Sequence, residues 1–293
     1  MTAEIDAISE HSCFGGLVGY YSHKSEATKC SMKFSVFVPP QAADGPVPVL
    51  TWLAGLTCNE ETFMIKSGAQ RIAAELGLMI VAPDTSPRGD NVPDDADGGW
   101  DFGLGAGFYL DATEKPWSEN YNMESYVTND LQRAVFDNFP GDEAHQGIFG
   151  HSMGGHGALT LGMKHHEIYQ SISAFAPVAA PMDCPWGVKA FTNYLGKDRK
   201  AWEAHDASRI ILEVKGAGIR NRILVDQGLE DQFLDEQLGI DKFQDAAGKV
   251  GYHVDVRRHE GYDHGYFFIS TFMEDHLGHH AALLRPTEEA TTP

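Results

Sequence analysis

A serine between two glycines is the residue with the clearest chemistry in the sequence. Gly150, Ser152 and Gly154 have the G-x-S-x-G spacing of a nucleophile elbow, a tight turn between a strand and a helix that exposes a serine hydroxyl. Glycine fits on both sides because a Cβ there would collide where the strand and the helix converge. Residues 146–149 are typical of a strand and residues 155–163 of a helix, so we predict that Ser152 is the nucleophile of an acyl hydrolase.

A serine hydroxyl is a weak nucleophile at neutral pH, so this hypothesis requires a general base and a carboxylate that orients the base. His264 is the favoured base, because it lies in the glycine-flanked loop EGYDHGY, whereas His259 belongs to the preceding strand region. The carboxylate should follow the strand 222–227. The candidates are Asp226, Glu230 and Asp231, and their spacing alone does not choose among them.

Two backbone amides should stabilise the oxyanion that forms when the serine attacks a carbonyl. The amide of Met153 supplies one, and the loop 53–57 after an early strand is where the second should come from. Cys58 follows this loop and is expected at the edge of the substrate pocket; the alternative is that it serves only as a small buried hydrophobic residue.

Strands and helices alternate along the chain, which predicts a mainly parallel sheet covered by helices. The expected strands are 30–38, 47–53, 78–82, 147–150, 171–175, 221–226 and 252–257. The expected helices are 67–76, 124–139, 153–164, 240–248 and 267–284. No repeat or long linker divides the chain, so we predict one domain over residues 1–293. Within it, 83–116 is too long for a simple connection, and 176–218 suggests a lid or a pocket wall.

Charge argues against nucleic acid or a membrane as a partner. The chain has 22 Lys and Arg against 42 Asp and Glu, a net charge of −20, and such a surface repels phosphate backbones and anionic lipid. No run of 18 apolar residues could span a bilayer, and the first ten residues do not resemble a secretory signal peptide. The four cysteines, at 13, 30, 58 and 184, match no redox or zinc pattern, so a reduced, cytoplasmic protein is expected.

Neither a metal nor a nucleotide is expected. The glycine-rich run 103–107 lacks the spacing of a phosphate-binding loop, and no helix is expected directly after it. The segment 166–170 lacks the second histidine of a zinc protease helix. His276, His279 and His280 are expected to face solvent on the last helix.

Short motifs between about residue 12 and residue 284 resemble the S-formylglutathione hydrolase family, also called esterase D. They include FGG at 14–16, WLAGLTC at 52–58, APDTSPRG at 82–89, GHSMGGHGAL at 150–159, CPWG at 184–187, DQG at 226–228, DQFL at 231–234 and EGYDH at 260–264. The resemblance implies an α/β-hydrolase fold. It also implies hydrolysis of S-formylglutathione to glutathione and formate in formaldehyde detoxification, without a metal or another cofactor.

The same resemblance implies Ser152, Asp231 and His264 as the catalytic triad, which decides among the three acids. It implies that the amides of Leu56 and Met153 are the oxyanion donors. It also places Trp186 near the bound substrate, and it favours a homodimer.

Two departures from the family pattern concern the substrate region. Ala54 stands where the family often has Ser, and Leu229 and Glu230 replace a more usual Lys-Asp pair. The second change removes a cation that could attract the carboxylates of glutathione. The alternatives are a general short-chain carboxylesterase and a non-catalytic binding protein of the same fold.

Overall fold

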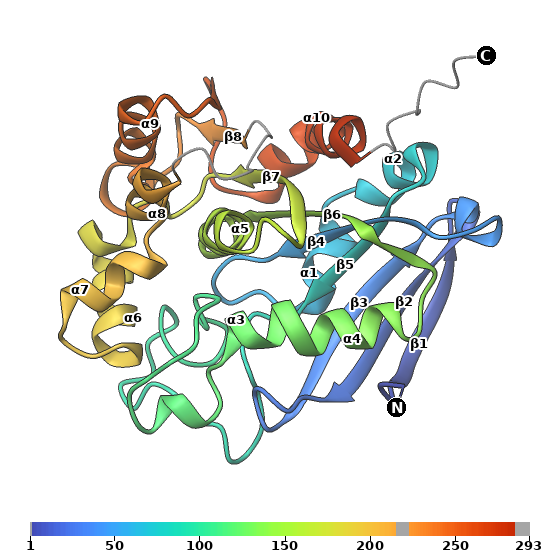
Figure 1. Ribbon diagram of the computed structural model, residues 1–293, viewed down its shortest axis with the longest axis horizontal. Coiled ribbons are helices and arrows are strands. Elements are labelled where there is room, and N and C mark those ends of the chain that lie inside the picture. The colour runs from blue at the N-terminus through green and yellow to red at the C-terminus, as the bar shows by residue number, and fades with distance from the viewer. Residues whose placement is uncertain (1, 215–222, 285–293) are drawn as a thin grey trace.

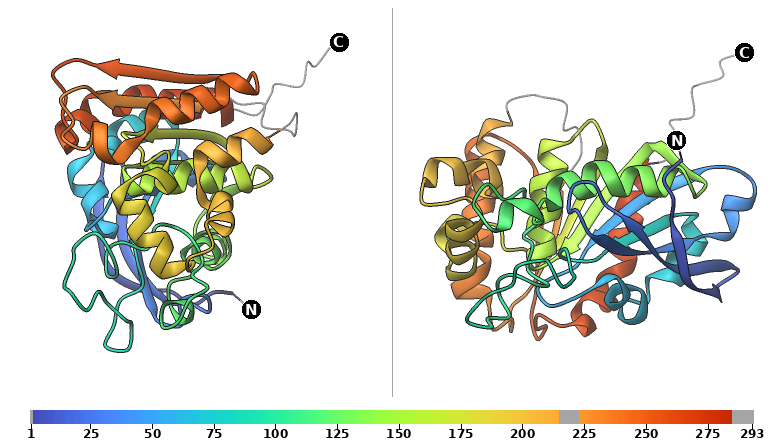
Figure 2. Two further views of the ribbon diagram at one scale, coloured as in Figure 1. Left: turned by 90° about the vertical axis from the view of Figure 1, so that its left-hand side faces the viewer. Right: turned by 90° about the horizontal axis from the view of Figure 1, so that it is seen from below.

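A sheet of nine strands crosses the part of the chain that the computed structural model describes, residues 2–214 and 223–284. The strand order is β1-β2-β3-β5-β4-β6-β7-β8-β9. β4 to β9 pair in parallel, whereas β1, β2 and β3 form an antiparallel end beside β5. Figure 2 shows this blue end of the sheet opposite the orange C-terminal end. The strands are β1 (Asp6–Cys13), β2 (Gly16–Lys24), β3 (Ser31–Val38), β4 (Val47–Leu53), β5 (Met79–Pro83), β6 (Gly141–His151), β7 (Tyr169–Phe175), β8 (Ile223–Gly228) and β9 (Val254–His259).

The predicted strands are confirmed, with ends that differ by a few residues. β4 has the predicted bounds. β6 begins six residues before residue 147, and these residues were not predicted because they are mostly polar and partly exposed. Residues 221 and 222 of the expected strand 221–226 lie outside the described residues. β1 and β2 are additional to the prediction; β1 is exposed on both faces and therefore carries no apolar alternation.

The helices account for most of the predicted ones. They are α1 (Glu60–Lys66), α2 (Ala69–Leu76), α3 (Met123–Ser125), α4 (Leu131–Phe136), α5 (Met153–Lys164), α6 (Pro185–Tyr194), α7 (Arg199–Trp202), α8 (Ala207–Glu213), α9 (Ile240–Lys249) and α10 (Tyr266–Leu284). The expected helix 124–139 is divided, because a wider π turn at Tyr126–Asp130 separates α3 from α4.

Helices α5 and α10 cover opposite faces of β7. A Cβ added at Gly162 in α5 would lie 2.7 Å from Ile172 Cδ1, whereas the next strand residue, Ser173, hydrogen-bonds to α10. Successive side chains of a strand point to opposite faces, so the two helices sandwich the sheet. Figure 1 shows α10 above β7 and α5 below it.

The histidines of α10 correct one prediction from the sequence. His276 and His280 are fully buried rather than solvent-facing. His276 Nδ1 lies 2.8 Å from Ser173 Oγ, and His280 bridges Ser173 and Ser171 at 2.8 and 2.7 Å. Hydrogen bonds to the strand hydroxyls offset the cost of burying these polar rings. Burial lowers the pKa of both histidines.

An aromatic cluster forms the centre of the core next to the site. Trp52 of β4 stacks on Phe63 of α1 with ring centroids 4.3 Å apart, and it meets Phe149 of β6 edge-on at 4.9 Å. All three side chains are fully buried. Burial of each contributes about 1.5–3 kcal/mol, which fixes β4 and β6 as neighbours directly below the loops that follow them.

Residues 176–214 of the expected segment 176–218 form a helical layer beside the long loop 84–116; residues 215–218 lie outside the described part of the chain. Tyr194 Oη in α6 donates to Ala106 O at 3.0 Å and accepts from Gly103 N at 3.2 Å. Figure 1 shows the yellow helices of this segment beside that loop. In residues 2–214 and 223–284, no helix is both long and apolar enough to cross a membrane.

Candidate active site

Ser152 occupies a strained turn between β6 and α5. Its φ of 57° and ψ of −119° lie outside the regions that L-residues usually adopt. The flanking glycines are required by space: a Cβ at Gly154 would lie 1.9 Å from Leu53 O, and one at Gly150 would lie 2.3 Å from Gly154 O. The surrounding structure holds the turn, because Ser152 N donates to Phe175 O at 3.0 Å.

The other predicted residues approach Ser152 because parallel strands end at the same edge of a sheet. Ser152 follows β6, Asp231 follows β8 by three residues and His264 follows β9 by five. The loop after β4 reaches the same edge, since Leu53 pairs with Gly150 in the sheet. Four segments distant in sequence therefore surround one site.

Asp231 holds His264 directly. His264 Nδ1 lies 2.5 Å from Asp231 Oδ2, and the carboxylate side chain is fully buried. The amide of Phe233 donates to Asp231 Oδ1 at 2.8 Å, and Gln227 Nε2 donates to Asp231 Oδ2 at 3.2 Å. These donors fix the carboxylate, which in turn fixes one ring nitrogen of His264 and leaves the other for the cavity.

The alternative acid and base are engaged elsewhere. Asp226 accepts two hydrogen bonds from Arg257, each 2.6 Å long, and lies 3.3 Å from His276. Burial alone would raise the pKa of Asp226, but His276 and Arg257 together hold that pKa far below its usual range. His259 lies 3.3 Å from Asp226 and stacks on Phe272. The structure therefore brings His264 together with Asp231 and not with Asp226.

A cavity of about 210 Å³ lies over the serine. It contains the predicted Ser152, His264, Leu56, Cys58 and Trp186. Ser152 Oγ has no hydrogen-bond partner among the residues that the structure describes. Catalytic contacts of this kind often tighten only when substrate is bound.

Other residues of the cavity wall were missed by sequence reasoning. They are Trp100, His151, Phe233 and Tyr266, whereas Gly55 and Thr57 of the wall belong to the loop 53–57 that was expected to supply an oxyanion donor. Phe233 and Tyr266 each stand two residues after a predicted site residue, and Trp100 stands in the long loop, so proximity to the motifs was the only available signal. These added side chains make the cavity wall aromatic rather than charged.

His151 contributes a neutral imidazole to this wall. Its ring centroid lies 4.3 Å from that of His264, and its side chain is buried. Burial, together with the charge that His264 can carry, places the pKa of His151 well below its ordinary value. A second positive charge is thus kept away from His264.

Two backbone amides are free to serve the cavity. The amides of Leu56 and Met153 donate to no protein acceptor within the described ranges. Met153 is the first residue of α5, where N–H groups have no partner inside the helix. Gly55 packs on the serine, since a Cβ there would lie 3.2 Å from Ser152 Cβ, which places the Leu56 amide next to Ser152.

The thiols and the acidic side chains of the described residues form no metal site. Cys13, Cys30, Cys58 and Cys184 are all free thiols. Burial raises the pKa of Cys58 at the cavity wall, so this thiol is largely protonated at neutral pH.

Comparison with known proteins identifies the family. A family model described as "Putative esterase" matches residues 25–279. The chain is 52% identical to S-formylglutathione hydrolase from Bos taurus, over 94% of this chain and 98% of that protein. The chain belongs to this family of esterases. It is also 49% identical to S-formylglutathione hydrolase from Arabidopsis thaliana, over 97% of this chain and 99% of that protein.

A solved structure supports the same assignment for the esterase. The S-formylglutathione hydrolase from Agrobacterium tumefaciens matches it with a TM-score of 0.92 and 47% identity, covering 96% of this chain and 100% of that one. The α/β-hydrolase fold and the family resemblance that the motifs implied are therefore confirmed.

Proposed function

We propose that this esterase is a serine hydrolase that cleaves the thioester S-formylglutathione to glutathione and formate, in formaldehyde detoxification. Near-full-length identity of about 50% to S-formylglutathione hydrolases supports the substrate. The observation that carries the mechanism is the Asp231–His264 contact of 2.5 Å beside Ser152 in one cavity. In this proposal Ser152 is the nucleophile, His264 the base and Asp231 the residue that orients it.

The first half of the reaction transfers the formyl group to the enzyme. Ser152 Oγ bonds to the formyl carbon while its proton passes to His264. The carbonyl oxygen becomes an oxyanion, which accepts hydrogen bonds from the amides of Leu56 and Met153. The C–S bond then breaks, and the glutathione sulfur leaves as the thiol with the proton from His264, which returns the imidazole to its neutral form.

Water completes the cycle. His264 removes a proton from a water molecule whose oxygen attacks the formyl ester of Ser152. Breakdown of the second tetrahedral species releases formic acid, which ionises to formate, and returns the proton to Ser152 Oγ. No redox step and no cofactor are required for this balance.

The cavity suits a short acyl group. Its volume of about 210 Å³ is smaller than pockets that enclose drug-sized ligands, so the formyl thioester fits inside while most of glutathione lies at its mouth. Trp186 contacts Trp100 and Phe233, with ring centroids 5.5 and 4.7 Å away. We therefore assign the segment 176–214 as one wall of the pocket, with Cys58 on another.

Steady-state kinetics on S-formylglutathione tests this proposal. Ser152→Ala should lower kcat/KM by at least about 10⁴-fold, with an unchanged circular dichroism spectrum. Ser12→Ala, at an exposed position in β1, is the matched control and should retain parental activity. Turnover by the parent that is no faster on S-formylglutathione than on p-nitrophenyl acetate would favour a general short-chain carboxylesterase, and no turnover of either would favour a binding protein.

Three further predictions accompany the function. The esterase is expected to act as a homodimer and to be cytoplasmic, and nucleic acid is not expected among its partners. Gel filtration with light scattering, and localisation of a tagged protein, measure the first two.

A further inference from the structure

The loop 54–58 that carries the Leu56 amide is held at several points from outside the cavity. Tyr109 Oη donates to Ala54 O at 2.9 Å, and Thr57 N donates to Gly105 O at 2.9 Å. Thr57 itself has a φ of 68°, which costs energy for a branched residue. Such a backbone persists only where neighbouring contacts hold it.

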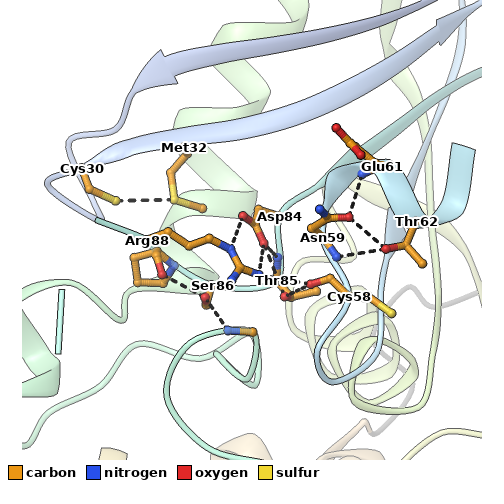
Figure 3. A network of polar contacts seen from close by, with 12 residues as sticks. Cys30, Met32, Cys58, Asn59, Glu61, Thr62, Asp84, Thr85, Ser86 and Arg88 are labelled. Carbon is orange, nitrogen blue, oxygen red and sulfur yellow. Dashed lines mark hydrogen bonds and ion pairs between the residues drawn. The ribbon is translucent and has the colours of Figure 1, made fainter. Parts of the chain in front are cut away.

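The carbonyl of Cys58, at the end of this loop, is held by the segment after β5. Thr85 Oγ1 donates to Cys58 O at 2.6 Å, and Arg88 Nη2 approaches the same oxygen at 3.4 Å. Arg88 also binds Asp84 through two hydrogen bonds of 2.7 and 3.0 Å, and Thr85 N donates to Asp84 at 2.7 Å. Figure 3 shows the Arg88 guanidinium turned toward Asp84, with Thr85 pointing to Cys58.

The glycine-rich run 103–107 is part of the same support. Gly105 N donates to Ser86 Oγ at 2.8 Å, which fixes the carbonyl that accepts from Thr57. Gly105 has a φ of 78°, and a Cβ there would lie 3.2 Å from Thr57 Cα. Glycine at 105 thus permits the close approach of two backbones, which is a use for this run other than phosphate binding.

We propose that Asp84, Thr85 and Arg88, here called the loop clamp, position the loop 54–58 so that the Leu56 amide points at the reacting carbonyl oxygen. The clamp residues are absent from the cavity wall, so they act through the loop as positioning residues. The inference rests on the proposed function, because it assumes that Leu56 is an oxyanion donor. The Asp84 side chain is buried and the Arg88 side chain is partly exposed, so solvent screens only one side of their ion pair.

The clamp has a kinetic signature that a merely structural role lacks. An oxyanion donor must lie about 2.7–3.1 Å from the developing charge, and loss of one donor costs about 10²–10³-fold in kcat. A small shift of the loop that weakens the hydrogen bond from the Leu56 amide without breaking it should lower kcat less, by about 10-fold. The loss should appear in kcat with KM nearly unchanged, because the oxyanion forms only in the transition state.

Thr85→Val tests the proposal, since it removes the hydroxyl and keeps the shape. We expect kcat to fall about 10-fold on both S-formylglutathione and p-nitrophenyl acetate, because the two substrates share the oxyanion. Thr85→Ser, which keeps the hydroxyl, should restore most of the activity. The inhibition constant of a trifluoromethyl ketone, whose adduct with Ser152 carries an oxyanion, should rise in parallel with the loss of kcat/KM.

Matched variants separate the possible results. Thr128→Val removes a buried threonine hydroxyl that also donates to a backbone carbonyl, Glu124 O at 2.8 Å, and should leave kcat at the parental value. Arg88→Lys, at a partly exposed side chain, keeps the charge but loses the two-pronged contact, and it serves as the test if Thr85→Val does not fold.

Two results would overturn the clamp. One is a Thr85→Val protein, or failing that an Arg88→Lys protein, with lowered stability but parental kcat. The other is a rise in KM at constant kcat, which would place the effect in substrate binding. A parent enzyme inactive on S-formylglutathione but active on the aryl ester would instead refute the proposed function, while the aryl ester still tests the clamp.

Discussion

Mild acid should weaken the folded esterase by several kcal/mol, because histidines are buried in it as neutral rings. His151, His156, His276 and His280 are each less than 10% exposed. Burial lowers the pKa of each, to about 3 for His156. In the unfolded chain the same side chains are exposed to water and titrate near 6.5.

The sign follows from proton binding. When the pKa of a histidine is lower in the fold than in the unfolded chain, the unfolded chain binds the proton first as pH falls. The free energy of unfolding therefore decreases as pH falls below about 6.5 and stops decreasing at the folded pKa. Between about pH 7.5 and pH 5.5 each histidine that stays neutral in the fold costs about 1.4 kcal/mol, so several such groups together cost several kcal/mol. His165, whose pKa is raised by its hydrogen bond to Glu124, acts in the opposite direction and reduces the loss.

Burial raises the pKa of the Glu60 and Asp206 carboxyls, so these two groups, like His165, act against the loss, whereas Glu124 does not contribute in this range. The pKa of Glu124 is lowered to about 2: burial would raise it, but its contacts with His165 and Lys164 outweigh burial. Its stabilising effect is lost only as pH falls below about 4.5, outside the window. A loss of several kcal/mol is a large part of the 5–15 kcal/mol typical of folded proteins.

Urea unfolding at about pH 7.5, 6.5 and 5.5, followed by tryptophan fluorescence, measures the effect. Lower pH is avoided because the net charge disappears near the isoelectric point of 4.9. His156→Gln cannot titrate and should reduce the pH dependence by about 1 kcal/mol, whereas His166→Gln, at an exposed position, should not. A free energy of unfolding that changes by less than about 1 kcal/mol across this range would refute the reasoning.

Further predictions concern the elbow, the buried ion pair and the cavity thiol. Gly154→Ala should prevent folding or abolish activity, because its Cβ would overlap Leu53 O; soluble yield and circular dichroism measure this. Asp226→Ala should destabilise the fold by about 3–5 kcal/mol in urea unfolding, because it leaves the Arg257 charge without its buried partner. A bulky maleimide should inactivate the parent, and the inactivation should be faster at higher pH because burial raises the pKa of the Cys58 thiol. Cys58→Ala should remove this sensitivity. If the Cys58→Ala enzyme is inhibited as strongly as the parent, the thiol at the cavity wall is not the target.

Local patterns predicted the elements that carry the site. The apolar run of β4 and the elbow around Ser152 are signals that each span only a few neighbouring residues, and both are present where they were expected. The antiparallel hairpin of β1 and β2 was not predicted, because an edge strand exposed on both faces has no apolar alternation to detect.

The choice among Asp226, Glu230 and Asp231, which lie on one strand and in the loop after it, needed long-range geometry. Asp226 and Asp231 are five residues apart, but one faces α10 and Arg257 and the other faces His264. Their sequence neighbourhoods do not contain the partners, which come from β9 and its loop. Only the family resemblance had favoured Asp231 beforehand.

The sequence alone determined the alternating fold class, the elbow and the candidate residues around it, because turn strain and hydrophobic periodicity are properties of short segments. The tertiary structure alone decided which carboxylate contacts His264, which histidines are buried as neutral rings, and which aromatic side chains line the cavity. Those facts depend on where the ends of parallel strands meet and on which face of a strand each side chain points to, and segments far apart in the chain determine both.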